Sequence, residues 1–393
     1  MKDVYKELKP PERILLGPGP SNVNPRVYKA MMTPVIGYLD SELLRIMDEV
    51  VEMLRKVFKT KNSITFPLSG TGTAGMETAL CNVIEPEDEV LVCIKGYFGA
   101  RIKDIVERLG GKPIIIEVPW GEIIPPEKVE KMLKEKKIKL VAIVHAETST
   151  GVLQPLKEIS NIVKKTDALL LVDTVASLGG TSIETDELGI DIVYSATQKC
   201  LSGPPGLAPI TFSKKAIEII RKRKNNISSF YLDINLLEKY WFGEKRKYHH
   251  TISMSLIYAL HEALQIVLEE GLEKRFERHR RNAEALRSGL KAMGLKLIAK
   301  EGYQAPMITA VAIPDGVSDK QIRARLLKEY GIEIGGGLGE FSGKIWRIGL
   351  MGESSTQKNV LLVISALEKL LSEAGYKVKP GTGVSAVSAY YQS

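Results

Sequence analysis

A lysine and an aspartate lie at the ends of two neighbouring predicted strands, and together they could perform one specific kind of chemistry. The apolar run 168–172 ends at Asp173, and the run 191–195 continues through a Ser/Thr-rich turn to Lys199. A lysine amine can hold the aldehyde of pyridoxal 5′-phosphate (PLP) as a Schiff base, while a carboxylate keeps the pyridine nitrogen of that cofactor protonated. A single lysine at a strand end is usually only solvated, so this hypothesis depends on other features agreeing with it.

A glycine-rich turn between a predicted strand and a predicted helix could bind a phosphate. Within residues 69–75, Gly70, Gly72 and Gly75 satisfy the G-x-G-x-x-G pattern of dinucleotide sites. That pattern needs an acidic residue at the end of the next strand, but the next strand runs into Lys95. Free amides at a helix N-terminus and threonine hydroxyls serve a single phosphate equally well. We therefore favour a monophosphate and keep a nicotinamide dehydrogenase as the alternative.

Further polar residues stand where a substrate or a cofactor could reach them. Arg347 lies within an otherwise apolar predicted strand, where its guanidinium could bind a substrate carboxylate or form a structural ion pair. The segment from Tyr248 to Thr251 places four hydrogen-bonding side chains in a row, which could form a plain loop or contact a phosphate. Asp173 could instead cap the helix that follows it. From the residues alone these alternatives stay open.

Alternating strands and helices must position these residues. Apolar runs predict strands at 64–69, 90–94, 113–118, 139–144, 168–172, 191–195 and 208–212. Helical periodicity predicts helices at 41–59, 75–84, 99–109, 126–137 and 156–166. Repeated βα units of this kind predict an α/β fold with a mostly parallel seven-stranded sheet between helices.

The last third of the chain predicts a second, smaller α+β domain. It opens with a helix-rich stretch at 253–292 and continues with strands near 295–299, 307–313, 331–334 and 345–349 and helices at 318–329 and 356–374. We expect the segment after Tyr376 to be loose or to lie as a strap on the surface. The 393 residues exceed the size of a single core. We expect an N-terminal arm over 1–20, a large cofactor-binding domain over 21–270 and the small domain over 271–393.

Composition argues against several classes of protein. No apolar run approaches the roughly 20 residues that span a membrane, and the N-terminus has no apolar leader, so the cytoplasm is the expected location. The net charge is +8, but basic residues alternate with acidic ones, and we expect no nucleic-acid partner. The three cysteines form no CxxC pair and the five histidines have no ligand-like spacing. We therefore expect reduced thiols and no metal.

Taken together, these motifs resemble the class V aminotransferases of PLP fold type I, and most closely the alanine–glyoxylate and serine–pyruvate aminotransferase group. The resemblance runs along nearly the whole chain, in several motifs that occur in the same order. The segments that carry it are 16–22, 149–155, 170–180, Gln198-Lys199 with 204–206, 248–252, 335–339 and 347–352.

The resemblance implies PLP as the cofactor and a role for each residue around its ring. Lys199 forms the Schiff base and moves the substrate proton, and Asp173 pairs with the ring nitrogen. Val175 packs on one face of the ring, and the ring stacks on Phe98, which stands where animal members have Trp. Thr148 lies near the phenolic oxygen of the ring.

The resemblance also implies how the phosphate and the partner subunit are arranged. The residues that bind the phosphate are Thr71, Gly72, Thr73 and Gln198, with Thr73 standing where animal members have His. Tyr248 and Thr251 reach the phosphate of the neighbouring subunit, which implies a homodimer with shared active sites. A non-catalytic binding protein is disfavoured, because Lys199, Asp173 and Arg347 are all present.

The implied reaction moves an amino group from serine or alanine to glyoxylate or pyruvate by a ping-pong mechanism. Arg347 binds the α-carboxylate of the substrate, with Thr148 beside it, and the loop that contains Gly19 closes over the site. The same fold also serves PLP lyases and cysteine desulfurases. A desulfurase needs a reactive cysteine on a mobile loop, and none of Cys81, Cys93 and Cys200 is well placed for that role.

Overall fold

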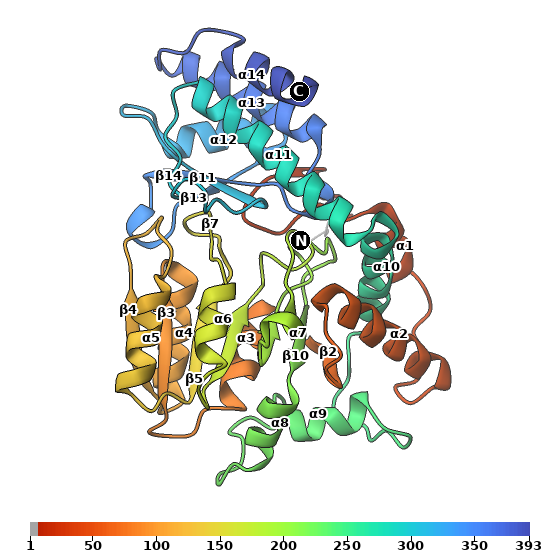
Figure 1. Ribbon diagram of the computed structural model, residues 1–393. Coiled ribbons are helices and arrows are strands. Elements are labelled where there is room, and N and C mark those ends of the chain that lie inside the picture. The colour runs from red at the N-terminus through yellow and green to blue at the C-terminus, as the bar shows by residue number, and fades with distance from the viewer. Residues whose placement is uncertain (1–6) are drawn as a thin grey trace, which may run out of the picture.

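A seven-stranded sheet flanked by helices forms the larger part of the molecule, and a smaller group of helices and strands lies above it in Figure 1. The computed structural model describes residues 7–393. The strands are β1 (Ile14–Leu15), β2 (Ile64–Ser69), β3 (Glu89–Ile94), β4 (Lys112–Glu117), β5 (Leu140–Val144), β6 (Ala146–Glu147), β7 (Val152–Leu153), β8 (Leu169–Asp173), β9 (Ile192–Tyr194), β10 (Leu207–Phe212), β11 (Ile308–Ala312), β12 (Ile332–Glu333), β13 (Gly335–Gly336) and β14 (Ile345–Gly349). The helices are α1 (Pro25–Met31), α2 (Ser41–Phe58), α3 (Gly72–Cys81), α4 (Tyr97–Arg108), α5 (Pro126–Glu135), α6 (Lys157–Val163), α7 (Thr185–Leu188), α8 (Lys214–Arg221), α9 (Ile234–Trp241), α10 (Met254–Glu270), α11 (Leu272–Ala292), α12 (Asp319–Tyr330), α13 (Gln357–Glu373) and α14 (Thr382–Gln392).

The large sheet has the strand order β2-β10-β9-β8-β5-β3-β4. The pairs from β9 through β4 are parallel, whereas β10 runs antiparallel to both of its neighbours. All residues of β5 and β8 are buried, which explains why both strands are continuous apolar runs in the sequence. The mostly parallel α/β sheet is therefore confirmed. The carboxyl ends of its parallel strands share one edge, where α/β folds bind their ligands.

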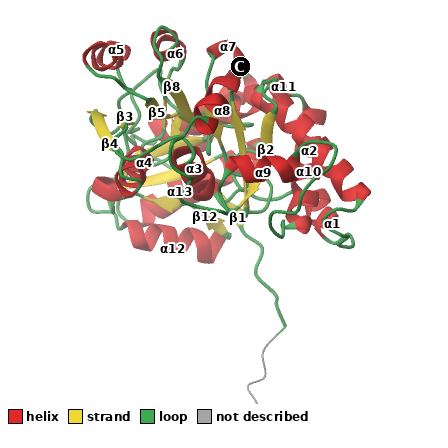
Figure 2. Ribbon diagram, turned by 90° about the horizontal axis from the view of Figure 1, so that it is seen from below, coloured by secondary structure: helices red, strands yellow, loops and turns green. Residues whose placement is uncertain are grey.

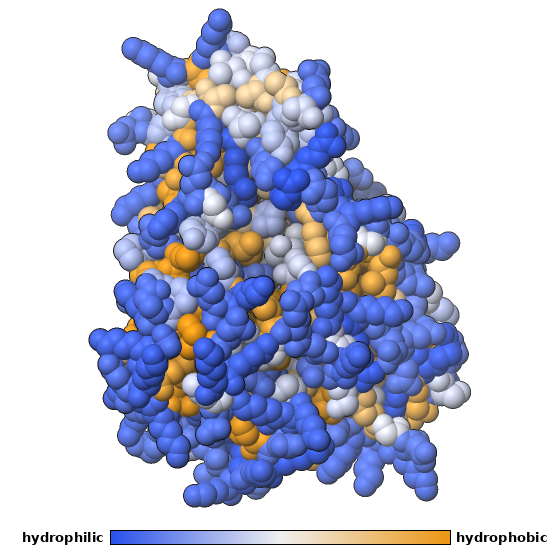
Figure 3. Space-filling model, viewed as in Figure 1, coloured by the Kyte–Doolittle hydropathy of each residue, from blue (hydrophilic) through white to orange (hydrophobic). Residues whose placement is uncertain are grey.

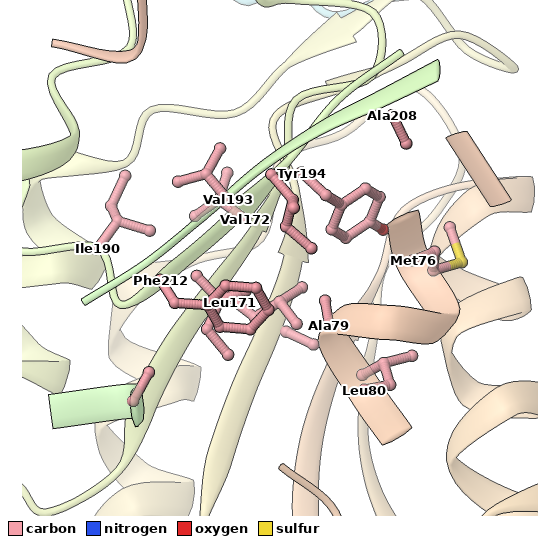
Figure 4. Packing of buried hydrophobic residues seen from close by; sticks show 14 of the residues in the cluster. Met76, Ala79, Leu80, Leu171, Val172, Ile190, Val193, Tyr194, Ala208 and Phe212 are labelled. Carbon is pink, nitrogen blue, oxygen red and sulfur yellow. The ribbon is translucent and has the colours of Figure 1, made fainter. Parts of the chain in front are cut away.

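The helices that cover the sheet follow the predicted apolar spacing. Helix α2 begins after Asp40, whose side chain accepts a hydrogen bond from the Glu42 amide, and it ends at Lys59, which adopts a left-handed backbone. Its buried face joins a core that includes strand residues such as Tyr194 and Phe212 and helix residues such as Met76. Figure 4 shows part of this core, with Met76 beside the Tyr194 ring.

A second hydrophobic cluster lies in the C-terminal part of the chain. It is built from α11, α12, α13 and α14 and from the small sheet β11-β14-β13. Leu16 from the N-terminal arm belongs to it, because β1 pairs with β12 and the Gly349 amide donates to the Leu16 carbonyl at 2.7 Å. Of the predicted arm over 1–20, residues 1–6 lie outside the described part, and in Figure 2 the described loop before β1 leads away from the body. The predicted domain boundaries stay a prediction.

Two expectations about the C-terminal part are wrong. The segment after Tyr376 is not a loose strap, because Thr382–Gln392 forms helix α14 on α11. The Glu368 carboxylate accepts hydrogen bonds from the Gly381 and Gly383 amides and so fixes the start of that helix. Residues 295–299 form no strand; Leu297 makes a single isolated bridge to Val311.

Hydrophilic residues cover most of the face shown in Figure 3, with smaller hydrophobic areas between them. Many of the charged side chains pair one helical turn apart, as Lys134 does with Glu130 at 2.9 Å. Within residues 7–393, no helix combines the length and the apolar character that a membrane crossing requires.

Candidate active site

A cavity of about 150 Å³ lies where the strand ends of the large sheet meet the N-terminus of α3. It brings together nine residues that the sequence predicted for the site, namely Thr71, Gly72, Thr73, Phe98, Thr148, Asp173, Val175, Gln198 and Lys199. Met76, Arg101, Val144, Ala146 and Ala176 complete its lining. Residues more than 100 positions apart in the sequence therefore converge at one edge of the sheet.

Asp173 ends the central strand β8, and its carboxylate is held by two donors. The Val175 amide donates to Oδ1 and the Tyr194 hydroxyl donates to Oδ2, each at 2.8 Å. Because the side chain is buried, the pKa of Asp173 is raised to about 6, and the two hydrogen bonds act in the opposite direction. The carboxylate is fixed in position and can neutralise a cation in the cavity. Residues 175–177 form a turn and no helix begins there, so Asp173 does not act as a helix cap.

Lys199 enters the cavity from the turn that follows β9. Its amine donates to the Pro18 carbonyl, and the Ser21 hydroxyl donates to the Lys199 carbonyl at 2.8 Å. Burial, with a smaller contribution from the nearby Arg347 guanidinium, lowers the pKa of Lys199 to about 8. A neutral amine is therefore accessible near neutral pH, and a neutral amine is the nucleophile that attacks an aldehyde.

The N-terminus of α3 is open to an anion. Thr71 is its N-cap residue but makes no side-chain capping bond, which leaves the amides of the first turn facing the cavity. A Cβ atom on Gly72 would lie 3.2 Å from Val175 Cγ2, so a glycine lets the start of α3 pack closely against Val175. The Oε1 atom of Gln198 is buried and has no hydrogen-bond partner among residues 7–393. These features fit a phosphate at this end of the cavity.

Phe98 forms a wall of the cavity together with an arginine that the sequence did not indicate. The Arg101 guanidinium lies 4.9 Å from the centre of the Phe98 ring, and its Nη1 donates to Thr73 Oγ1 at 3.3 Å. The cation–π contact holds the guanidinium against the Phe98 ring, and the hydrogen bond to Thr73 links it to the start of α3. Arg101 therefore connects the aromatic wall to the anion-binding end.

Arg347 lies at the centre of β14 and approaches the cavity from the smaller part of the molecule. Its Nε donates to the Gly336 carbonyl at 2.6 Å, and its Nη1 donates weakly to the Thr148 carbonyl at 3.4 Å. The side chain is buried, and burial lowers its pKa to about 10. No carboxylate of residues 7–393 forms an ion pair with it. Arg347 is thus a buried cation whose forked end can accept a carboxylate.

Gly19 lies directly against the Lys199 side chain, and the predicted closure of its loop over the site stays a prediction. A Cβ atom at this position would lie 2.6 Å from Lys199 Cδ, and the residue has φ +114°, which side chains rarely adopt. Tyr248 and Thr251 are not brought to the cavity of this chain. Both are exposed, and their hydroxyls hydrogen-bond to each other at 3.0 Å.

Comparison with known proteins decides the family. The model of the family described as Aminotransferase class-V matches residues 21–346. The chain belongs to the class V aminotransferases. This aminotransferase is 43% identical to the (S)-ureidoglycine–glyoxylate transaminase of Bacillus subtilis over 99% of its own length and 97% of that protein. It is 42% identical to the alanine–glyoxylate aminotransferase of Callithrix jacchus, covering 96% of this chain and 92% of that one.

Solved structures agree with the fold as well as with the family. The crystal structure of an alanine–glyoxylate aminotransferase from Nostoc sp. superposes on this aminotransferase with a TM-score of 0.92 and 46% identity, covering 94% of this chain and 97% of that chain. The protein is a transaminase of PLP fold type I, and its cofactor is pyridoxal 5′-phosphate.

The residues of the cavity fit this cofactor. The aminotransferase offers an uncapped helix N-terminus for the phosphate, a carboxylate for the ring nitrogen and an amine for the aldehyde. The alternatives left open by the sequence lose their support. Strand β3 runs into Lys95 where a dinucleotide site needs an acid, and all three cysteines are buried with their pKa raised to about 12.

Sequence reasoning missed three polar residues of this aminotransferase site: Tyr194, Arg101 and Glu147. Tyr194 is the register partner of Asp173 on β9, and a tyrosine in a fully buried strand of three residues was the available signal. Arg101 follows Phe98 by one helical turn on α4. The fully buried Glu147 accepts hydrogen bonds from the Phe98 amide at 3.2 Å and from the Ser149 hydroxyl at 2.6 Å, which only the folded chain reveals.

Proposed function

We propose that this aminotransferase moves the amino group of a small monocarboxylic amino acid, serine or alanine, to glyoxylate or pyruvate. The observation that carries the proposal is Arg347, a buried guanidinium beside the cavity that forms no ion pair within residues 7–393. The other arginine at the cavity, Arg101, is already engaged with Thr73 and the Phe98 ring. One arginine fork anchors one carboxylate. A substrate with a second carboxylate would bury that group unpaired, which is costly.

The acceptor glyoxylate is supported by the relatives. The Bacillus subtilis, Callithrix jacchus and Nostoc proteins are all named for transfer to glyoxylate, although their amino donors differ. Both named donors, alanine and (S)-ureidoglycine, carry one carboxylate, as the single Arg347 requires. Ureidoglycine therefore belongs in the same panel of donors as serine and alanine.

Each residue of the proposed mechanism has a defined position. The α3 amides with Thr71, Gly72, Thr73 and Gln198 would hold the phosphate. Asp173 would hold the ring nitrogen, with its own carboxylate fixed by Val175 and Tyr194. When bound, pyridoxal phosphate supplies an electron sink that stabilises negative charge at the substrate Cα. That chemistry needs the ring nitrogen cationic, which is the task of Asp173.

Lys199 would have two tasks in each half-reaction. Its neutral amine would hold the cofactor through the aldehyde, and once the substrate amine has released it, the same amine would take the proton from the substrate Cα and return it to the cofactor. Val175 and Phe98 would fix the plane of the ring, with Thr148 beside its phenolic oxygen. Because one substrate leaves before the other enters, the kinetics should be ping-pong.

The N-terminal arm would exclude water from this reaction. Residues Pro18 and Gly19 lie on the Lys199 side chain, while Leu16 in the same segment hydrogen-bonds with Gly349 at the end of β14. The arm thus touches the strand that carries Arg347 and the lysine at once. A carboxylate that binds at Arg347 could therefore shift the position of the arm over Lys199.

We further propose a homodimer in which Tyr248 and Thr251 complete the phosphate site of the partner subunit. Support comes from their exposure in a single chain and from their absence among the residues that line that chain's cavity. Tyr28, Met32, Val35 and Phe230 are also exposed large hydrophobic residues, and such residues mark interaction surfaces when they gather.

A donor panel tests the proposed substrate class. Half-reaction rates should be high with serine, alanine or (S)-ureidoglycine and low with aspartate and glutamate. Arg347→Lys should weaken donor binding by about tenfold or more, because an ammonium cannot reproduce the fork, and should leave the visible absorption of the bound cofactor unchanged. Arg323→Lys is the matched control, since Arg323 is paired with Asp319 at 2.7 Å. Faster turnover of the two acidic donors would overturn the single-anchor proposal.

A further inference from the structure

Lys95 is a buried cation that the proposed mechanism does not use. It follows the last residue of β3, its side chain is fully buried, and its Nζ has no hydrogen-bond partner among the described residues. A buried ammonium without a direct partner is costly and survives only where other charges compensate for it. The groups that face Lys95 should therefore show what its charge does.

Two of the groups around Lys95 are carboxylates and two are neutral. Glu147 and Asp173 attract its charge, whereas burial lowers its pKa to about 8. His145 is neutral, because burial and the Lys95 charge lower its pKa to about 3. Cys93 is neutral as well, since burial raises its pKa to about 12.

The backbone geometry places these groups at the same edge of the sheet. Glu147 accepts from the Phe98 amide of the turn that follows Lys95, and the His145 amide donates to the Asp173 carbonyl at 2.9 Å. The buried charge of Lys95 therefore lies near the two carboxylates.

Both carboxylates are buried, and each is fixed by hydrogen bonds of its own. Glu147 Oε1 accepts from the Ser149 amide at 3.1 Å and from the Ser149 hydroxyl, and Oε2 accepts from the Phe98 amide. The negative charge of Glu147 raises the pKa of Asp173, and the positive charge of Lys95 lowers it. Two like charges at close quarters resist ionising together unless a cation lies between them.

The remaining charged groups belong to the catalytic set on other elements. Arg347 on β14 interacts with Glu147, and Lys199 interacts with Asp173. Tyr194 on β9 donates its hydroxyl hydrogen to Asp173 and stays neutral, because burial and the Asp173 charge raise its pKa. With all three groups charged, Lys95, Glu147 and Asp173 would sum to one negative charge, which a cationic ring nitrogen at Asp173 would balance.

We propose that Lys95 is a positioning residue whose buried ammonium keeps Asp173 ionised beside the second carboxylate, Glu147, so that Asp173 is ready to hold a cationic ring nitrogen. The inference rests on the role of Asp173 in the proposed function. Lys95 would act on the cofactor only through the charge of Asp173. It does not line the cavity and would touch neither cofactor nor substrate.

The test measures binding of 4-deoxypyridoxine 5′-phosphate, which has the ring nitrogen and the phosphate but no aldehyde, to the cofactor-free full-length protein between pH 5 and 9. Affinity should fall at acid pH as Asp173 is protonated. In Lys95→Met the pKa of Asp173 rises, since a neighbouring cation is lost, and the acidic limb of the profile should move up by about one pH unit. Lys103→Met, at a partly exposed lysine on α4 that pairs with Glu107, should leave the limb in place.

Two further variants separate this inference from the proposed function. Asp173→Asn should remove the part of the acidic limb that benzyl phosphate does not share, because the phosphate itself titrates near pH 6; if that part remains, the proposed role of Asp173 fails. Lys95→Met/Glu147→Gln should move the limb back toward the wild-type position, because one charge of each sign is removed. Benzyl phosphate, which lacks the ring nitrogen, should show no shift of the acidic limb in Lys95→Met. No amino or 2-oxo acid is used, so an error in the substrate class leaves this test intact.

A folded Lys95→Met protein that binds with the wild-type pH profile, or more weakly by the same factor at every pH, would overturn the inference. If Lys95→Met does not fold, Lys95→Gln is measured in its place, and the same two results would overturn the inference. If neither single variant folds, Lys95→Met/Glu147→Gln should still fold, because it removes one charge of each sign. Failure of this double variant to fold would count against the inference.

Discussion

Tyr194 and Asp173 are register partners on adjacent parallel strands, and the Tyr194 hydroxyl donates to Asp173 Oδ2 at 2.8 Å. The ring of Tyr194 is fully buried against Met76 of α3, so this donor cannot swing away. The sheet itself thus orients the carboxylate that serves the cofactor nitrogen. A donor built into the neighbouring strand stabilises the ionised form of Asp173.

Tyr194→Phe should therefore weaken the site without unfolding the protein. Hydrogen bonds to charged groups contribute about 1.5–3 kcal/mol, so the pKa of Asp173 should rise and the half-reaction with alanine should slow by about tenfold at pH 7. Stopped-flow absorbance of the bound cofactor measures the rate. Tyr376→Phe, which removes a hydroxyl bonded to the Met293 carbonyl, is the control. Equal rates for wild type and Tyr194→Phe would show that the hydroxyl has no influence on Asp173.

The lowered pKa of Lys199 predicts a pH profile for covalent capture of the cofactor. The folded-state pKa is about 8 rather than 10.5, so the fraction of neutral amine grows as pH rises and is nearly complete above pH 9. The rate at which the cofactor-free protein captures pyridoxal phosphate should rise with pH, reach half of its maximum near pH 8 and level off above about pH 9. Nα-acetyl-lysine in solution provides the reference profile. A rate that keeps rising past pH 10 would mean that Lys199 is an ordinary, solvated lysine.

Gly19 and Gly17 offer a matched pair of substitutions in the arm. A methyl group on Gly19 would overlap the Lys199 side chain, whereas on Gly17 it would lie 3.8 Å from the Gly335 amide nitrogen, an ordinary contact. Gly19→Ala should reduce capture of the cofactor by about tenfold or more, because the arm or the lysine must move. Gly17→Ala should stay close to wild type. Normal capture by Gly19→Ala would show that the arm does not need to lie on the lysine.

Mixed dimers test whether the sites are shared. Lys199→Ala and a Tyr248→Phe/Thr251→Ala double variant should each have low activity. In a mixed dimer both defects fall in one site and the other site is intact. Random exchange in an equal mixture should therefore restore about a quarter of the wild-type sites. Native mass spectrometry can verify exchange, and no recovery of transamination after verified exchange would mean that each site is built within one chain.

Sequence reasoning reached the large sheet and most of the cavity because both depend on local pattern. The fully buried strands β5 and β8 are continuous apolar runs in the sequence. Asp173 ends one strand and Lys199 follows another, at the edge of the sheet where a ligand is expected. The residues it missed act through contacts that no local pattern encodes. Tyr194 contacts Asp173 only because the two residues are register partners on adjacent strands. Lys95 likewise depends on groups from other parts of the chain that only the fold brings near it.

Helix α14 was missed for a similar reason. Its segment is rich in Gly, Ser and Val and has little amphipathic pattern, so it predicts no helix by itself. Its start is held by Glu368 of α13, and Tyr391 donates to Asn282 Oδ1 on α11 at 2.7 Å. The helix is thus stabilised by tertiary contacts, and intrinsic propensity contributes little.

The central claim is that Lys199 both captures the cofactor and moves the substrate proton. The direct measurement is the single-turnover rate of alanine with Lys199→Ala saturated with pyridoxal phosphate, followed by the pyruvate formed. Loss of the amine removes nucleophile and base at once, so the rate should fall by about 10⁴-fold or more while the phosphate end still binds the cofactor. Pyruvate formation within about tenfold of the wild-type rate would contradict the account.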